Sequence, residues 1–293
     1  MWNTSSSGWL SIGTALALTL VGTGCTQNAP STDSAATNPS PAASASASGI
    51  GTLEIRANGE DFIRQGFLSR DGWKVTFDHA YVTVAAIKAY QTDPPYDATS
   101  EKPLTATPQV TLDPPQTVDL AAGDATADPV LVAAVQAPSG RYNALSWQMP
   151  PATTGPAAQS VVLLKGKATK ADQAIAFTLN LDRPLEYQCG EFVGDVRKGN
   201  LAAQGTAELE LTFHFDHLFG DGTLPANDEL NQQALGFGPL AAIAQDGKVE
   251  ANLTQLQQAL SSEDFEKFSK ILPSLGHVGE GHCRATMVTT NKS

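Results

Sequence analysis

The chain has 293 residues, of which 41% are hydrophobic and only 16% are charged, so it can form one large domain with a packed core. Its formal net charge is −12 and its pI is near 4.7. This balance argues against a nucleic-acid partner, because phosphate binding needs clustered Lys and Arg; it suits an exported domain whose surface attracts cations.

The N-terminal segment has the features of an export signal. Residues 1–24 contain no charged side chain, and the apolar run Leu10–Val21 is long enough for a signal-peptide core but too short to span a bilayer. It leads into Val21-Gly22-Thr23-Gly24-Cys25, which resembles the lipobox of bacterial lipoproteins. The resemblance implies that Cys25 is lipidated and anchors the protein in a membrane of the bacterial cell envelope, facing the periplasm or the cell surface. The alternative is an ordinary signal peptide cleaved nearby, which also exports the protein.

The segment that follows is a predicted tether. Residues 25–51 are rich in Ser, Ala and Pro and contain few large apolar side chains. Such a segment cannot offset the entropy cost of ordering, so we expect it to be disordered and to hold the domain away from the membrane. We therefore predict a signal peptide at 1–24, a tether at 25–51 and a single β-rich domain at 52–293.

Short strand patterns separated by Pro and Gly fill the first part of this domain. The most β-rich run is Trp73–Tyr90, whose alternation slips between Phe77 and Val82 and so predicts a β-bulge around Asp78-His79. Regular short strands with such turns predict a mainly β fold, either an antiparallel β-sandwich or a barrel-like domain. The other strands predicted here are 52–57, 109–112, 116–120, 140–148, 161–167, 174–181 and 185–189.

One later strand leads into a histidine-rich turn. Ala207–Phe213 alternates cleanly, and we expect the alternation to continue to Asp216, with its polar face carrying His214 and Asp216. Their Cα atoms would lie ~6.5–7 Å apart, so both side chains could reach one ion. His217 breaks the alternation, which predicts that the strand ends there.

The pattern becomes helical after this turn. We predict a short helical insertion at about 228–272, whose last helix begins with acidic residues and ends before Pro273. Arg284–Thr289 is predicted to return as a closing strand. The four predicted helices are 228–235, 240–244, 253–260 and 262–271.

The chain contains three cysteines. If Cys25 is lipidated, Cys189 and Cys283 remain as an even pair in an exported protein, which favours a disulfide between them. The bond would fix the Gly-rich C-terminal segment onto the strand that ends at Cys189. In the alternative interpretation, Cys283 is a thiolate metal ligand.

Four of the five histidines lie in two short segments, His214-x-x-His217 and His277-x4-His282. Both spacings occur in single metal sites, and a nearby carboxylate can add an oxygen ligand. We predict that the two segments meet and bind a transition metal ion, with zinc and copper the foremost candidates. Any one of these histidines could instead be an ordinary hydrogen-bonded side chain. In order of preference, the candidate ligands are His214, His217, His282, Asp216, His79 and His277.

Other chemistry is less well supported. The acidic stretches around Asp221, Asn227–Glu229 and Asp246–Glu250 lack the spacing of an EF-hand loop, so we interpret them as solvated loops rather than calcium sites. Motifs of serine hydrolases, zinc proteases, and phosphate- or dinucleotide-binding proteins are missing from the sequence. A metal-dependent hydrolase, with Glu280 as a general base, is a lesser alternative.

Three stretches together resemble a family of uncharacterised bacterial lipoproteins: DGWKVTFDH at Asp71–His79, FHFDHLFGD at Phe213–Asp221, and GEGHC at Gly279–Cys283. The resemblance implies an exported β-rich domain and no established activity. The sequence thus predicts a lipid-anchored protein that binds a transition metal for metal handling or for structure. The alternative is an envelope binding module for a protein or glycan partner, in which the histidines are structural.

Overall fold

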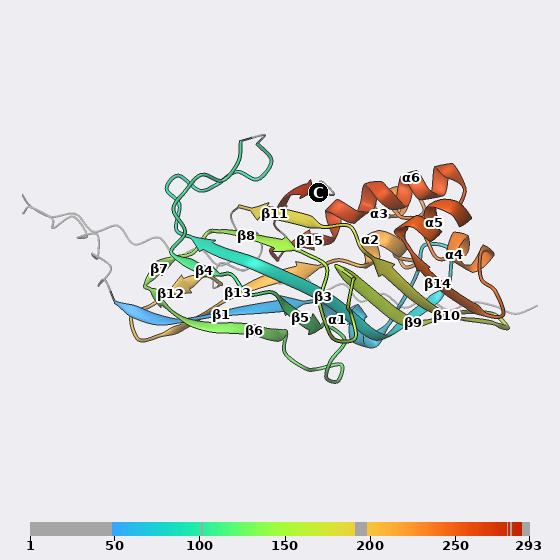
Figure 1. Cartoon of the computed structure of the whole chain (residues 1–293), viewed down its shortest axis with the longest axis horizontal. Coiled ribbons are helices and arrows are strands. Elements are labelled where there is room, and N and C mark those ends of the chain that lie inside the picture. The colour runs from blue at the N-terminus through green and yellow to red at the C-terminus, as the bar shows by residue number, and fades with distance from the viewer. Residues whose placement is uncertain (1–48, 101, 191–197, 280, 282, 289–293) are drawn as a thin grey trace, which may run out of the picture. The chain divides into compact units, whose positions relative to one another are not determined.

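Hydrogen-bonded strands form most of the fold, which Figure 1 shows as a computed structural model. The structure describes residues 49–100, 102–190, 198–279, 281 and 283–288, so the predicted signal peptide, the predicted lipidation site Cys25 and nearly all of the predicted tether lie outside the described residues. Residues Ala45–Ser293 belong to one compact unit.

The smaller sheet has four strands, and its centre is a parallel pair. β1 runs beside β13 with Leu53 opposite Ala207 and Ile55 opposite Leu209, and β6 pairs with the other edge of β1 in the antiparallel sense. The order is β15 (Gly276–His277), β13 (Thr206–Phe213), β1 (Ile50–Asn58) and β6 (Val130–Pro138).

The larger sheet has ten strands and is organised around the 17-residue strand β3 (Lys74–Tyr90). Its main path runs β14 (Lys248–Asn252), β10 (Gln173–Leu181), β9 (Val162–Lys170), β3, β8 (Ala144–Met149), β11 (Leu185–Cys189) and β16 (Cys283–Met287). The strands β2 (Phe67–Leu68), β4 (Val110–Leu112) and β5 (Gln116–Asp119) also pair with β3, and β7 (Gly140–Arg141) pairs with β12 (Asn200–Leu201) separately.

β3 contains two irregularities. The register with β9 shifts between Phe77 and His79, which confirms the bulge predicted from the slip in alternation. A second shift lies between Ala85 and Lys88, where Ala86 has a φ of 47° and the strand changes its partner from β9 to β8. With these irregularities, one long strand pairs with β9 over its first half and with β8 over its second half.

Apolar side chains from the two sheets form a shared core. Leu53, Ile55 and Leu211 are fully buried, and the Phe213 ring packs edge-on to Trp147 of the larger sheet at a centroid distance of 6.5 Å. Full burial of a side chain of this size contributes about 1.5–3 kcal/mol. Because Phe213 is fixed in this core, the residue that follows it leaves the sheet from a rigid position.

Short helices follow β13, as the sequence predicts. α5 begins with a capping box formed by Asn252 and Gln255, and the Ser261 side chain accepts a hydrogen bond from the Asp264 amide at the start of α6. No helix in the described part of the chain is long and apolar enough to cross a membrane. The helices are α1 (Glu60–Gln65), α2 (Asp216–Phe219), α3 (Glu229–Gln233), α4 (Gly238–Ala242), α5 (Leu253–Ala259), α6 (Ser262–Ile271) and the 3₁₀ turn η1 (Leu272–Leu275).

The mainly β fold class is therefore confirmed, and the sheets are open rather than closed into a barrel. Two features differ from the predicted antiparallel arrangement and from the predicted set of strands. The sheets are mixed, because β1–β13 and β10–β14 are parallel pairs. The strands β6 and β14 lie in stretches where the sequence patterns predicted none.

Candidate metal centre

The candidate site lies where β13 turns into α2. The expectation that β13 continues to Asp216 is wrong: the strand ends at Phe213, and a helix begins at Asp216. The His214 amide donates to the Leu275 carbonyl of η1 at 2.9 Å, and the His217 amide bonds to the His214 carbonyl at 3.3 Å. This tight turn, rather than strand alternation, brings the side chains of His214, Asp216 and His217 together.

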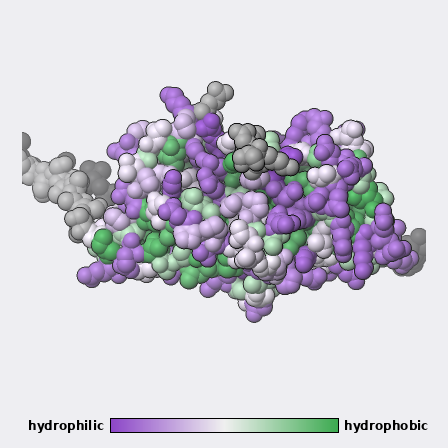
Figure 2. Space-filling view, viewed as in Figure 1, coloured by the Kyte–Doolittle hydropathy of each residue, from purple (hydrophilic) through white to green (hydrophobic). Residues whose placement is uncertain are grey.

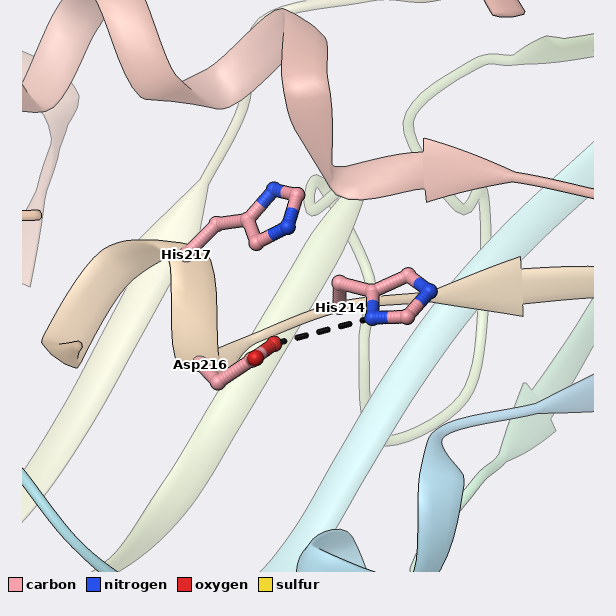
Figure 3. A group of neighbouring side chains, drawn as sticks. All are labelled: His214, Asp216 and His217. Atoms are coloured by element: carbon pink, nitrogen blue, oxygen red, sulfur yellow. Dashed lines mark ion pairs between the residues drawn. The ribbon is translucent and has the colours of Figure 1, made fainter. Parts of the chain in front are cut away.

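The three side chains converge closely enough for one ion. A ligand atom from each of His214, Asp216 and His217 lies within 4.8 Å of the others, and these three form the metal-competent group in the described part of the chain. Nδ1 of His214 is 3.7 Å from Oδ1 of Asp216, and the two side chains are only 14% and 22% exposed. Figure 3 shows the Asp216 carboxylate directed at Nδ1 of His214, with the His217 ring beside them. A cation placed among them would be partly shielded from water.

One carboxylate oxygen of Asp216 has no hydrogen-bond donor in the described part of the chain. Oδ1 is buried, and its neighbour His214 Nδ1, at 3.7 Å, is too far away for a hydrogen bond. A buried acceptor left in this way costs roughly 1–3 kcal/mol, and more for a charged group. A metal ion would satisfy this oxygen, and carboxylate and imidazole together suit zinc, copper, iron or manganese.

His217 is oriented by η1. Its Nδ1 lies 2.9 Å from the carbonyl oxygen of Ser274 and 3.2 Å from the Ser274 hydroxyl. The carbonyl can only accept, so Nδ1 carries a hydrogen, and in the neutral ring the lone pair is on Nε2. Metal-ligating histidines commonly donate their second nitrogen to a backbone carbonyl in this way.

His277 reaches the same place from the other segment, as predicted. It pairs with Thr212 across β15 and β13, and its ring centroid is 4.6 Å from that of His214 and 5.2 Å from that of His217. Its Nε2 lies 2.9 Å from the same Ser274 carbonyl. His277 therefore packs against the group, although its ligand atoms are not among those within 4.8 Å of one another.

The structure does not bring His79 to this cluster. His79 lies on the bulge of β3, where its Nδ1 is 2.7 Å from Oδ2 of Asp119 and its ring stacks on Tyr81 at 5.1 Å. It is 47% exposed. His282 and the lesser candidate Glu280 lie outside the described residues, so their predicted roles remain predictions.

The predicted disulfide is confirmed. Cys189 of β11 and Cys283 of β16 are directly opposite in the strand register, with Cα atoms 4.2 Å apart. Cys283 is therefore not a thiolate ligand. The bond ties the segment that carries His277 to the larger sheet, close to the site.

The acidic stretches near the site have local structural roles. Oδ1 of Asp221 accepts hydrogen bonds from the amide and hydroxyl of Thr223, both at 2.7 Å, and the Asp228 side chain accepts from the Leu230 amide at the start of α3. These bonds are those of a turn and a helix cap, which agrees with interpreting this stretch as a loop rather than a calcium site.

Two residues near the site were not anticipated from the sequence. Ser274, which orients both His217 and His277, is an inconspicuous residue after Pro273. Glu229 lines, together with His217 and His277, a cavity of about 370 Å³. No local sequence pattern marks either residue, because the packing of α3 and η1 around the turn places both of them.

Comparison with known proteins does not extend this description: no protein-family model, no curated protein and no solved structure matches the chain.

Proposed function

We propose that the protein binds a single transition metal ion through His214, Asp216 and His217, for metal handling or for structure. The observation that carries this proposal is the unsatisfied buried oxygen of Asp216, which lies 3.7 Å from an imidazole nitrogen in a group of converging ligand atoms. Zinc and copper are the preferred ions, because two imidazoles and one carboxylate match their ligand preferences.

Elemental mass spectrometry tests the proposal directly. The protein is purified without a histidine tag or chelator, dialysed, and then offered zinc or copper at slight excess. We expect about one equivalent of metal per chain, lost in the double variant His214→Ala/His217→Ala and kept in His79→Ala. An absence of uptake by the natural protein would refute the proposal, and equal uptake by the double variant would place the metal elsewhere.

We further propose that the protein is exported and anchored in a membrane through a lipid on Cys25. The support is the apolar, uncharged segment that precedes Cys25, together with a disulfide of the kind that persists in oxidising compartments. Metabolic labelling with a fatty acid should mark the natural protein and not Cys25→Ala. Labelling of both forms, or of neither, would contradict the anchor.

A second candidate function is an envelope binding module for a protein or glycan partner. One observation favours it. Within the described residues β6 pairs only with β1, so the other edge of this uncharged nine-residue strand is open, and Leu131 on it is 48% exposed. Figure 2 shows hydrophobic surface along the side of the molecule where Figure 1 places β6. Such edges accept an added strand from a partner.

This candidate makes an opposite prediction for the histidines. Binding of the protein to isolated envelope fractions should survive His214→Ala/His217→Ala and be lost in Ala134→Pro, which removes a β6 amide and disturbs the edge. Loss of binding in the histidine variant alone would favour the metal centre as the functional site.

A further inference from the structure

The metal-binding group adjoins one cavity, and a second cavity shares lining residues with the first; nothing above assigns a ligand to either. The first, of about 370 Å³, is lined by His217 and His277 of the site and by Glu229, Leu230, Gln233, Ile271 and Ser274. The second, of about 430 Å³, shares Gln233, Ile271 and Ser274 with it and extends along α6. Each lies within the range of about 300–1,000 Å³ that is usual for small-molecule sites.

The described residues leave the proposed metal with an incomplete set of ligands. They supply three converging ligand atoms, from His214, Asp216 and His217. Zinc in proteins takes four or more ligands, and a site with three protein ligands holds water or an exchangeable molecule in the next position. Because His217 belongs both to the group and to the wall of the first cavity, a small molecule in this cavity would contact one of the three proposed metal ligands.

The charges at the site and around the cavities do not favour an anion. A divalent ion held by the Asp216 carboxylate leaves one positive charge, and Glu229 in the wall of the first cavity offsets it. Glu263 and Glu266 of the second cavity match its two lysines in number, and Nζ of Lys270 is already paired with Glu266 at 2.7 Å. The side chains of Leu230 and Ile271 offer apolar contact instead.

We propose that the metal centre accepts a small neutral nitrogen donor, an imidazole or an amine with an apolar substituent, as an exchangeable ligand whose body occupies the two cavities. This inference rests on the proposed metal binding. The nitrogen lone pair forms a bond to the metal and displaces a water molecule, with no change of oxidation state. The substituent extends past Gln233 along Ile271 toward α6.

Cobalt(II) provides the test, because its visible absorption reports the number and type of its ligands. The full chain is loaded with cobalt and titrated with 1-methylimidazole, 1-butylimidazole and acetate. We expect a saturable spectral change with both imidazoles, about fourfold tighter binding for each methylene group that becomes buried, and little change with acetate. Cobalt content is measured after each titration to show that the donor has not removed the metal.

A matched pair of variants locates the ligand. Gln233 borders both cavities, so Gln233→Trp should fill the passage between them and abolish the preference for the butyl over the methyl compound. Gln257→Trp, at an exposed position of α5 outside both cavities, should behave like the natural protein.

Each outcome separates this inference from the proposal on which it rests. A chain that takes up no cobalt contradicts both. A chain that binds cobalt but shows no spectral response to either imidazole keeps the metal site and overturns the exchangeable position; His282 would then be tested as the fourth ligand by substitution with Ala. A response to acetate equal to that of imidazole overturns the neutral donor, and a preference unaffected by Gln233→Trp overturns the cavity assignment.

Discussion

Two histidine–aspartate pairs, one on β3 and one after β13, differ in how completely their carboxylates are satisfied. On the bulge of β3, Oδ2 of Asp119 meets Nδ1 of His79 at 2.7 Å, while Oδ1 accepts the amides of Ala80 and Ala121. After β13, Nδ1 of His214 is 3.7 Å from Oδ1 of Asp216, a buried oxygen that accepts no hydrogen bond from any described residue.

The difference shows that residue type alone does not identify a metal ligand. Asp119 already has the partners that a carboxylate needs, so a metal ion would have to displace hydrogen bonds. Oδ1 of Asp216 receives no hydrogen bond from the described residues, and it lies beside the stacked rings of His214 and His217. We therefore interpret the first pair as structural, and the second remains the proposed metal site.

Removal of the disulfide should reveal the largest difference in stability between the two regions. Replacing Cys189 and Cys283 by Ala should lower the free energy of unfolding by about 2–5 kcal/mol, because the bond closes a loop between residues 94 positions apart. Hydrogen exchange should then accelerate at the amide of Gly279, which donates to Thr212, more than at the amide of Ala80, which donates to Asp119. Equal acceleration at both amides would show that the two regions are not independently stabilised.

Metal addition should stabilise the protein through the His214–His217 group and not through His79. At a free zinc concentration 1,000 times the Kd, the free energy of unfolding should rise by about 4 kcal/mol in the natural protein and in His79→Ala. His214→Ala/His217→Ala should show no rise. Denaturant titration with and without zinc measures this, and a His79→Ala variant that no longer responds would contradict the assignment of that pair.

Removal of each carboxylate from the metal-free protein should lower the free energy of unfolding by unequal amounts. Asp119→Ala deprives two backbone amides and one imidazole of their acceptor, so we expect a loss of roughly 1–3 kcal/mol in unfolding free energy. Asp216→Ala removes an oxygen that accepts no hydrogen bond from the described residues, so the cost should stay below about 1 kcal/mol while metal affinity falls. Equal costs, measured by denaturant titration of chelator-treated protein, would mean that Asp216 has a structural role as well.

Local patterns predicted much of the fold. The bulge at Asp78-His79 followed from a slip in alternation, the boundaries of α6 from its capping residue and acidic first turn, and the disulfide from the even number of remaining cysteines. The first two signals lie within a few residues of the features they predict, and the third needs only a count of cysteines. The strand β6 gave no such signal, because its uncharged run VLVAAVQAP does not alternate between polar and apolar side chains.

The missed features depend on residues distant in the sequence. β14 contains Lys248 and Glu250 and was interpreted as an acidic loop, yet it becomes a strand by pairing in parallel with β10. His79 is a candidate ligand in the sequence because it sits on the predicted bulge, and its partner Asp119, 40 residues away, cannot be identified from the local pattern. Conversely, the prediction that the two histidine segments meet holds for His277, whose placement comes from the pairing of β15 with β13.

Titration of two tyrosines offers a smaller test of the same comparison. Tyr187 packs against Gly276, the residue before His277. Its ring is so close that a Cβ added to Gly276 would lie 2.6 Å from it. Tyr81 stacks on His79. Burial raises the pKa of Tyr187, and burial with the charge of Asp119 raises the pKa of Tyr81. Because Tyr187 is fully buried and Tyr81 is partly exposed, the larger effect on stability should come from Tyr187.

The sign follows from the proton count. Above a pH of about 10, an unfolded tyrosine loses its proton while folded Tyr187 keeps it, so the folded state binds more protons and stability falls as the pH rises. The slope for one such group is at most about 1.4 kcal/mol per pH unit. Denaturant titration at a series of pH values above 10 should show this decline in the natural protein and in Tyr81→Phe, and a shallower decline in Tyr187→Phe. If Tyr81→Phe flattened the curve as much as Tyr187→Phe, the region around His79 would be as tightly packed as the region beneath the metal centre, and the contrast between the two would fail.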